Sequence, residues 1–517
     1  MNVYLIAPMP SFGGDITLAD YQLPLDKPYA LIAAAGITTV AAFFDETFTL
    51  RLCDEITEEV DFDDPSEVIC ISMNISQAVR GIEIARRFRA QGRTVIMGGA
   101  HVSLAPEAFD GEADCLVIGE FEPIADQLIS DLRNGNLKPS YQGSKADLAL
   151  APQPRWDLYR NDRAISGVVQ TSRGCPFECN FCDVIQYLGR VQRHKPPELV
   201  IRELDQLYEL GYRSINLSDD NFTVYRQRAR TLLQALIAWN GRDGREPVQF
   251  NTQMSMDIAR DLDLLEQCNE AGLRSALVGI ETDNEEALKT SLKRQNLRQD
   301  LVAQCSRIVA AGVTVQAGMM AGFDSDNLSC FERLFNFGMA LPVVQLRLSV
   351  LVAPVATPLH AQLRAEGRLL EEATVNAGAV GRYWTNFEPK HMTRAQLAEG
   401  TSWLVDALME PDNVIRRFQH YASLLKSAPE HLRPSPRFRE GKVPPMLQLI
   451  HKGARDPGGR RIIEAVDALA KSRPEISADL INVLAIHLNS HLFNEQQKSK
   501  RPHPARNPAE CLIALSQ

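Results

Sequence analysis

The stretch Thr171–Cys182 reads T-S-R-G-C-P-F-E-C-N-F-C and contains three cysteines at C-x3-C-x2-C spacing, Cys175, Cys179 and Cys182. The run Ile165–Gln170 just before it is mostly apolar, so the pattern predicts a strand that leads into a cysteine-bearing loop. Iron–sulfur clusters are held by cysteine thiolates, usually four of them. Three close cysteines without an obvious fourth therefore indicate a 4Fe-4S cluster that leaves one iron open to an outside ligand.

The spacing leaves two other uses of these thiols open, half of a zinc site and three unrelated buried cysteines. Zinc sites usually pair one C-x2-C knuckle with a second pair or with histidines at a set distance, and none lies nearby in the sequence. The seven cysteines outside the motif are scattered and lie mostly in apolar segments, which favours reduced thiols over a disulfide framework. They are Cys53, Cys70, Cys115, Cys268, Cys305, Cys330 and Cys511.

Composition limits the class of protein and its partners. The chain has 517 residues, 45% hydrophobic and 23% charged, which predicts a globular protein of about two to four domains. It contains no apolar run long enough to span a bilayer, and it begins without the basic segment of a signal peptide. Residues 1–137 carry 8 basic and 22 acidic side chains. Because phosphate contacts need Lys and Arg, this acidic region argues against a nucleic-acid partner. The absence of long apolar runs and of a basic leading segment predicts a cytoplasmic protein with no transmembrane segment.

Residues 1–137 alternate short apolar runs with helical patterns, which predicts a doubly wound, Rossmann-like parallel sheet. Ligands bind such sheets at the carboxyl ends of the strands. Residues 138–162 contain several prolines and small polar residues and are predicted to form a linker. Strands are expected at Val3–Pro8, Thr49–Cys53, Val68–Met73, Thr94–Met97 and Cys115–Gly119, and helices at Tyr29–Ala42, Ala78–Gln91 and Pro123–Leu132.

Residues 163–370 repeat strand and helix patterns about six times and predict a partial TIM-type (β/α)6 barrel. Chemistry in such barrels takes place at the carboxyl ends of the strands, and Asp219, Asp220, Ser255 and Glu281 follow three of these strands in order. Each residue alone is a weak signal, because acidic residues after a strand commonly cap the next helix. After the cysteines, strands are expected at Ser214–Leu217, Gln249–Gln253, Ser275–Ile280, Thr314–Met319 and Val344–Leu351.

The cysteine spacing, with Phe181 before the last cysteine, resembles the cluster loop of the radical S-adenosylmethionine (SAM) superfamily. In that family the open iron binds the amino and carboxylate groups of SAM. Asp219-Asp220-Asn221-Phe222 resembles the D-D-x-F segment of cobalamin-type members, and Gly279-Ile280-Glu281 resembles a G-I-E segment that borders SAM. The resemblance implies that SAM is bordered by Phe181, Asp219, Asp220, Ser255 and Glu281.

Glycine-rich strand ends in the first domain resemble the cobalamin-binding domain that precedes many radical SAM cores. Glycine lets the backbone approach a large ligand closely, and no G-x-G-x-x-G follows the first strand, which disfavours a dinucleotide. The D-x-H-x-x-G signature is absent, so a histidine-ligated cobalamin is not expected. A Rossmann-like domain that only packs against the core remains the alternative. The resemblance implies that cobalamin is contacted by Gly98, Gly99, His101, Gly119 and Glu120.

Residues 371–517 predict a mostly helical extension. The run Thr385–Lys390, T-N-F-E-P-K, resembles the extension of a radical SAM subgroup that includes hopanoid-modifying enzymes. Together with the aromatic residues around Trp384, this resemblance favours a small-molecule or lipid-like substrate. Helices are expected at Arg394–Met409, Asn413–Lys426, Arg460–Lys471 and Ile476–Phe493.

The leading interpretation is a radical SAM enzyme that generates a 5′-deoxyadenosyl radical and methylates an unactivated carbon with the help of cobalamin. The protein would position the radical and exclude water, and an external one-electron reductant such as flavodoxin or ferredoxin would supply the electron. One alternative is a radical rearrangement, cyclisation or carbon–carbon bond formation without methyl transfer. Another is a non-catalytic iron–sulfur electron carrier or sensor, which the repeated βα pattern disfavours.

Overall fold

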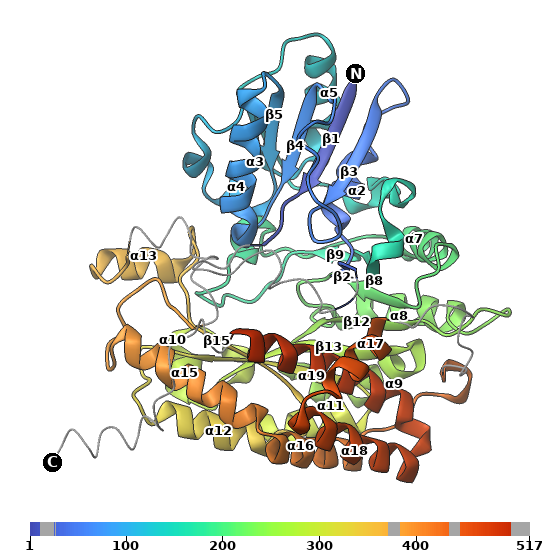
Figure 1. Ribbon diagram of the computed structural model, residues 1–517, viewed down its shortest axis with the longest axis vertical. Helices are drawn as coiled ribbons and strands as arrows, with labels where there is room; N and C mark the ends of the chain where they lie inside the picture. The colour runs from blue at the N-terminus through green and yellow to red at the C-terminus, as the bar shows by residue number, and fades with distance from the viewer. Residues whose placement is uncertain (11–24, 26, 371–382, 434–444, 498–517) are drawn as a thin grey trace.

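Two parallel sheets and a group of C-terminal helices make up the computed structural model, which describes residues 1–10, 25, 27–370, 383–433 and 445–497. Figure 1 shows the smaller, blue sheet at the top of the view and the larger sheet below it, with orange and red helices packed along the larger sheet. This arrangement confirms the predicted α/β class, with a Rossmann-like domain, a partial barrel and a helical extension.

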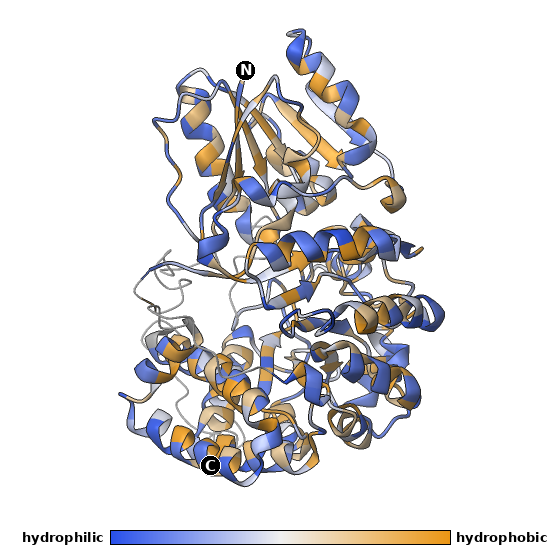
Figure 2. Cartoon of the chain, turned by 90° about the vertical axis from the view of Figure 1, so that its right-hand side faces the viewer, coloured by the Kyte–Doolittle hydropathy of each residue, from blue (hydrophilic) through white to orange (hydrophobic). Residues whose placement is uncertain are grey.

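The N-terminal sheet has six parallel strands in the order β3-β1-β4-β5-β6-β7. Its central strands are apolar and almost fully buried, because helices cover both faces of the sheet. Helices α2 and α5 pack on one face, and α3 and α4 pack on the other. Figure 2 shows these hydrophobic strands in orange between helices whose outer faces are blue. The elements are β1 (Asn2–Ala7), β3 (Thr49–Asp54), β4 (Val68–Ser72), β5 (Thr94–Gly98), β6 (Cys115–Gly119), β7 (Ser140–Gly143), α2 (Ala35–Ala41), α3 (Ala78–Ala90), α4 (Ala100–Leu104) and α5 (Ala125–Arg133).

Two short strands near the junction of the sheets were not expected. Strand β7 comes from the segment predicted to be a linker and forms the edge of the N-terminal sheet beside β6. Strand β2 (Ala30–Ile32) comes from the stretch predicted to begin a helix, and it pairs instead with the first strand of the core. Pairing with a distant strand overrides the local helical preference of these residues. The first domain is therefore tied to the core by a backbone ladder.

The core sheet has seven parallel strands in the order β15-β14-β13-β12-β11-β8-β2, and the six strands other than β2 are those of the predicted barrel. Because all of them run in the same direction, their carboxyl ends lie along one edge, which faces the N-terminal domain in Figure 1 near β8 and β9. The strands are β8 (Ala164–Val169), β11 (Ser214–Leu217), β12 (Gln249–Met254), β13 (Leu273–Glu281), β14 (Thr314–Ala321) and β15 (Gln345–Val350). Their helices are α7 (Pro197–Glu209), α8 (Arg226–Trp239), α9 (Leu262–Ala271), α10 (Glu285–Thr290), α11 (Leu301–Ala310), α12 (Cys330–Ala340) and α13 (Pro358–Ala365).

The C-terminal extension packs against the core through apolar helix faces that join the core's own hydrophobic cluster. The four helices expected from the sequence are present, and α17 is an additional one. No helix in the described ranges is long and apolar enough to cross a membrane. The helices are α15 (Arg394–Met409), α16 (Pro411–Leu424), α17 (Pro445–Gly453), α18 (Pro457–Ser472) and α19 (Ser477–Gln497).

Because α19 contains a buried histidine, His487, we expect acid to lower the stability of this extension. Burial, with smaller contributions from the charges of Arg417 and His491, lowers the pKa of His487 to about 3. The unfolded chain, in which histidine has a pKa of about 6.5, therefore takes up this proton first as the pH falls. Stability from neutral His487 is complete above pH 6.5 and is lost progressively toward pH 3. We expect the extension to be about 2 kcal/mol less stable at pH 5 than at pH 7.5.

Hydrogen exchange of the α19 amides, corrected for intrinsic rates, measures this loss. The control is His487→Leu, which cannot titrate and should show a flatter pH dependence between pH 7.5 and pH 5. Equal pH dependence in both proteins would show that His487 is not the responsible group.

Candidate active site

The cysteine loop leaves the core sheet through a short hairpin of β9 (Ser172–Arg173) and β10 (Arg193–His194). Gly174 begins the loop with a φ of +97°, and a Cβ at this position would lie 2.8 Å from the Val191 carbonyl oxygen. A side chain is therefore excluded here. The Cys175 N–H donates to the Gly189 carbonyl oxygen at 3.2 Å, which holds the first cysteine against the segment that leads back to β10.

The three predicted ligands lie in one partly buried site. Burial raises the pKa of the Cys175 thiol and raises that of Cys182 to about 12, and the charges of the neighbouring thiols add to both shifts. Such a set becomes thiolate only beside positive charge, as bound iron would provide. In the described part of the chain, no three His, Cys, Asp or Glu side chains are arranged to hold a single metal ion. The donor set fits a cluster whose separate irons each take one thiolate.

Two residues that the sequence analysis missed lie beside the thiols. Gln295 Nε2 is 3.7 Å from Cys179 Sγ, close enough to donate a hydrogen bond to sulfur, and such bonds tune cluster potentials. Lys293 Nζ lies 6.0 Å from the centre of the Phe181 ring. Both follow α10 and come more than a hundred residues after the cysteines, so local sequence patterns did not indicate them.

Asp219 and Asp220 were predicted together, but they have different partners. Asp219 is 1% exposed, and its carboxylate accepts hydrogen bonds from the Thr171 N–H at 2.9 Å, the Thr171 hydroxyl at 2.5 Å and the Ser172 N–H at 2.7 Å. Arg228 Nη1 lies 3.5 Å from the same carboxylate. Asp219 therefore holds the start of the cysteine loop against the end of β11.

Asp220 faces the cysteine loop from the next position. Its Oδ2 accepts a hydrogen bond from the Gly174 N–H at 2.8 Å, one residue before the first cysteine. Burial raises the pKa of its carboxyl group to about 6. Among the described residues, Asp220 has fewer hydrogen-bond partners than Asp219, so it retains more capacity to accept bonds from a ligand.

Ser255 and Glu281, at the ends of β12 and β13, are both buried and engaged. The Ser255 hydroxyl donates to Asp257 and accepts from Asn221 Nδ2 at 3.0 Å. Glu281 has a φ of +68° at an irregularity in the pairing of β13 with β14. Its Oε1 accepts a hydrogen bond from Lys293 Nζ at 2.6 Å. Burial alone would lower the pKa of Lys293, but Glu281 and the nearby thiols raise it, so the lysine is charged.

Gly279 explains why the G-I-E segment begins with glycine. A Cβ on Gly279 would lie 2.3 Å from Glu281 Oε1 and 2.7 Å from Lys293 Nζ. The missing side chain therefore makes room for the buried ion pair within the protein itself.

The glycines at the N-terminal strand ends, Gly98, Gly99 and Gly119, lie close to atoms of neighbouring segments. Gly99, with a φ of +100°, would place a Cβ 2.5 Å from the Met73 carbonyl oxygen, and Gly119, with a φ of +89°, would place one 2.2 Å from that of Gly143. Close approach of neighbouring backbone explains these two, and both also line the cavity described below. A Cβ on Gly98 would instead press on the Val117 side chain at 3.3 Å, and Gly98 likewise lines that cavity.

His101 lies apart from the cavity that these glycines border. It is 2% exposed, packs edge-on against the Phe109 ring at 5.5 Å between centroids, and does not line the cavity described next. Burial lowers the pKa of its imidazole. Its Nε2 has no hydrogen-bond partner among the described residues.

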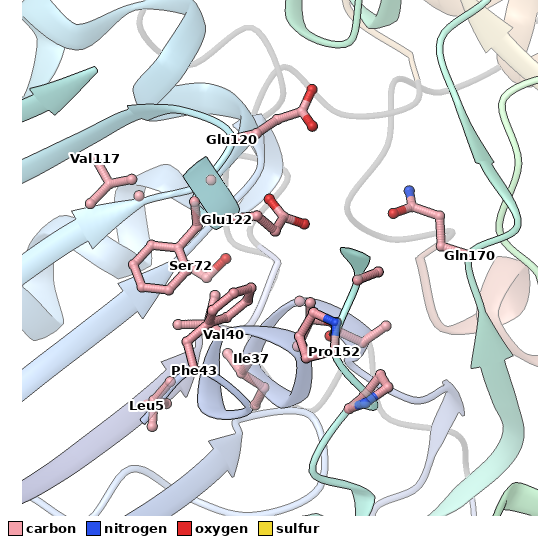
Figure 3. A pocket seen from close by; sticks show the side chains of 18 of the residues that line it. Leu5, Ile37, Val40, Phe43, Ser72, Val117, Glu120, Glu122, Pro152 and Gln170 are labelled. Carbon is pink, nitrogen blue, oxygen red and sulfur yellow. The ribbon is translucent and has the colours of Figure 1, made fainter. Parts of the chain in front are cut away.

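A cavity of about 340 Å³ lies between the carboxyl ends of β4, β5 and β6 and the first strand of the core. Figure 3 shows its apolar wall, with Ile37 and Val40 of α2 and Phe43 from the turn that follows it. Its polar wall includes Glu120, Glu122 and Gln170, the last of which comes from the core. Ligand cavities typically combine apolar walls with a few polar groups in this way.

Gly36 in α2 also lines this cavity and was not singled out from the sequence. The nearest atom to a Cβ at Gly36 would be Ser72 Oγ at 3.6 Å. Gly36 from the helix and Gly98 from the sheet both lack side chains at the cavity wall, which fits a large ligand lying against the sheet.

Two sequence comparisons identify the family. Residues 169–338 match the radical SAM superfamily, and residues 357–502 match a domain of unknown function, DUF4070. The chain is 31% identical to the hopanoid C-2 methylase of Rhodopseudomonas palustris over 356 residues, which cover 67% of each protein. The chain belongs to the radical SAM superfamily. Enzymes of this superfamily bind a 4Fe–4S cluster and SAM, which confirms the family and the two cofactors predicted from the cysteine loop.

Two further comparisons extend this likeness. An uncharacterized methyltransferase of Synechocystis sp. is 34% identical over 351 residues, which cover 67% of this radical SAM chain but 65% of that protein, slightly less than two thirds. The cobalamin-dependent radical SAM enzyme OxsB, solved with aqua-cobalamin and SAM bound, shares the fold with a TM-score of 0.61 at 14% identity. That likeness covers 96% of this chain and 80% of OxsB.

The T-N-F motif that resembled hopanoid-modifying enzymes serves to attach the extension of this radical SAM protein to the core. The Thr385 hydroxyl donates to the Leu351 carbonyl oxygen at 2.7 Å. The Asn386 side chain exchanges two hydrogen bonds of 2.9 Å with the Ala353 backbone, and Phe387 is 1% exposed. Trp384 remains 38% exposed beside this motif.

Proposed function

We propose that the protein is a cobalamin-dependent radical SAM methyltransferase that acts on an unactivated carbon of a small-molecule or lipid-like substrate. The observation that carries the proposal is the cavity at the strand ends of the N-terminal sheet, where a Cβ at Gly36 would meet no atom closer than 3.6 Å. Four of the predicted contacts, Gly98, Gly99, Gly119 and Glu120, line its wall. A corrinoid is larger than this cavity, so we propose that only a part of it enters. The names of the related methyltransferase and methylase support methyl transfer.

When bound, the cluster, SAM and cobalamin supply the radical and the transferable methyl group. The residues of the chain hold and orient these groups. Cys175, Cys179 and Cys182 would hold the cluster, and Asp220 would accept a hydrogen bond from the SAM ammonium, because its carboxylate faces the loop beside Gly174. The buried ion pair of Glu281 and Lys293 would border SAM.

The test uses anaerobically purified protein with a reconstituted cluster, hydroxocobalamin, a chemical reductant and SAM labelled in its methyl group. We expect corrinoid to remain bound after desalting, 5′-deoxyadenosine to form, and label to enter a component of a cell extract. Formation of 5′-deoxyadenosine with a product that shows no added methyl mass would favour a radical rearrangement or cyclisation. Absence of bound corrinoid would contradict the proposal.

Filling the cavity provides a direct test of where the corrinoid lies. Gly36→Leu should raise the Kd for hydroxocobalamin at least about tenfold, because the larger side chain enters the proposed ligand space. Leucine has a higher helix propensity than glycine, so α2 should remain folded. The measurement is corrinoid absorbance retained after desalting, together with iron content.

Gly36→Ala is the matched control, since its Cβ meets Ser72 Oγ at an ordinary contact distance of 3.6 Å. It should bind corrinoid like the unaltered protein. Full corrinoid loading of Gly36→Leu would show that the ligand lies elsewhere.

A further inference from the structure

Four charged side chains join the N-terminal sheet to the hairpin that carries the cysteines, and we call Glu120, Glu122, Arg173 and Arg193 the Glu120 node. Glu120 directly follows β6 and is 2% exposed. Its carboxylate accepts hydrogen bonds from Arg193 at 2.7 and 2.8 Å and from Arg173 at 2.8 Å. Burial alone would raise the pKa of Glu120, but these bonds and the Ala146 N–H lower it, so the group is ionised.

Arg173 occupies the centre of the node. It lies on β9, two residues before Cys175, and faces Arg193 across the hairpin. Besides Glu120, it donates to Glu122 Oε1 at 2.5 Å and to Gln170 Oε1 at 2.7 Å. A planar guanidinium that holds three acceptors at once is fixed in position. The node therefore determines where the cysteine loop begins relative to the N-terminal sheet.

The node is also part of the cavity wall. Glu120, Glu122, Gln170 and Arg173 all line the cavity, and Figure 3 shows Glu120 and Glu122 on one side of it with Gln170 across the open space. A ligand in the cavity thus meets the same acceptors that position Arg173. The pairs are largely shielded from solvent, since the side chains of Arg173 and Glu122 are 13% and 14% exposed.

We propose that the Glu120 node couples the two cofactor sites, so that a corrinoid in the cavity and SAM at the cluster strengthen each other's binding. Arg173 is the positioning residue, and the inference rests on the proposed function for the identity of both ligands. A ligand in the cavity contacts the acceptors that hold Arg173, so it stabilises the position of the cysteine loop in which SAM binds at the cluster. By linkage, the increase in affinity is the same in both directions. If the Glu120 node only held the two sheets together, the affinity for SAM would not depend on the corrinoid, and the affinity for the corrinoid would not depend on SAM.

The experiment measures the Kd of SAM by equilibrium dialysis on protein with a reconstituted cluster, with and without saturating hydroxocobalamin. For the unaltered protein we expect about tenfold tighter SAM binding with hydroxocobalamin present. Glu122→Gln removes one ionic partner of Arg173, and Arg173→Lys keeps the charge but not the forked geometry. Both substituted residues line the cavity, so each variant is saturated with hydroxocobalamin at a concentration set by its own Kd. At saturation the effect of one ligand on the other should fall below about twofold.

Glu178→Gln is the matched control. Glu178 lies inside the cysteine loop and pairs with Arg190 at 2.7 Å, but it is 40% exposed in its side chain and does not line the cavity. This variant should retain the tenfold effect. Hydrogen exchange of residues 172–194 provides a second measurement, and hydroxocobalamin should slow it in the unaltered protein and in Glu178→Gln, but not in Glu122→Gln.

The outcomes separate this inference from the proposed function. Binding of both ligands to the unaltered protein without mutual effect would overturn the coupling and leave the proposed function intact. Retention of the tenfold effect in Glu122→Gln and Arg173→Lys would also overturn it. Failure of the unaltered protein to bind hydroxocobalamin would overturn the proposed function, and the coupling with it.

Discussion

Cys182→Ala is expected to abolish reductive cleavage of SAM. Cys182 is one of the three predicted cluster ligands, and the neighbouring thiols of Cys175 and Cys179 contribute to raising its pKa. In the proposed function, the cluster supplies the electron that cleaves SAM. Loss of one of three ligands leaves two, too few to retain a cubane of four irons. Formation of 5′-deoxyadenosine should fall by about three orders of magnitude or more, to the background of cluster-free protein. The measurements are iron and sulfide content, the electron paramagnetic resonance signal of the reduced protein, and 5′-deoxyadenosine by chromatography.

The control for this prediction is Cys305→Ala, which removes a fully buried thiol from α11. That variant should retain its iron and its rate of SAM cleavage. If Cys182→Ala still held four irons, a ligand outside the three-cysteine loop would have to replace it.

Substitutions of the adjacent residues Asp219 and Asp220 should have different effects, because we expect Asp219 to stabilise the fold and Asp220 to bind SAM. Asp219→Ala leaves two buried N–H groups and a hydroxyl without their acceptor and removes the carboxylate beside the Arg228 guanidinium. Breaking such a buried charged network costs about 3–5 kcal/mol. We expect a lower urea midpoint for the core and poor cluster incorporation, because the cysteine loop loses its attachment to β11.

Asp220→Asn should instead leave the stability of the core nearly unchanged and weaken the binding of SAM. Asparagine has nearly the same shape and can still accept the Gly174 N–H bond, so stability should change by less than about 1 kcal/mol. Loss of the negative charge should raise the Kd of SAM about tenfold, since hydrogen bonds to charged groups are the stronger ones. Urea unfolding and equilibrium dialysis measure the two effects. If Asp219→Asn raised the Kd of SAM and Asp220→Asn did not, the assignment would have to be reversed.

Much of the fold followed from local patterns. The expected strand at Ser214–Leu217 and the expected helix at Arg394–Met409 have these bounds in the structure, because periodic burial of apolar residues acts within one element. Strands β2 and β7 could not be expected in the same way. Each has three or four residues, and each exists through pairing with one distant neighbour, β8 or β6.

In the candidate site too, some features followed from the local sequence and others depended on distant residues. Glycine at positions 98, 99 and 119 could be read as space for a ligand, yet the Met73 and Gly143 carbonyl oxygens explain two of the three. Sequence alone could not distinguish them, because the atoms that crowd a missing Cβ come from other strands. All three glycines line the cavity together with Gly36, which could not be singled out because it lies in a helix without a recognisable motif.

The sequence by itself determined the cysteine spacing, the order of the βα units and the family, since these depend on neighbours along the chain. Tertiary structure decided what each polar residue does, because their partners are far away in sequence. Asp219 meets Thr171 across 48 positions, and Glu120 meets Arg193 across 73. A buried carboxylate is anchored by whichever donors the fold brings to it. The fold anchors Asp219 to the cysteine loop, leaves Asp220 facing that loop, and makes Glu120 a link between the two sheets.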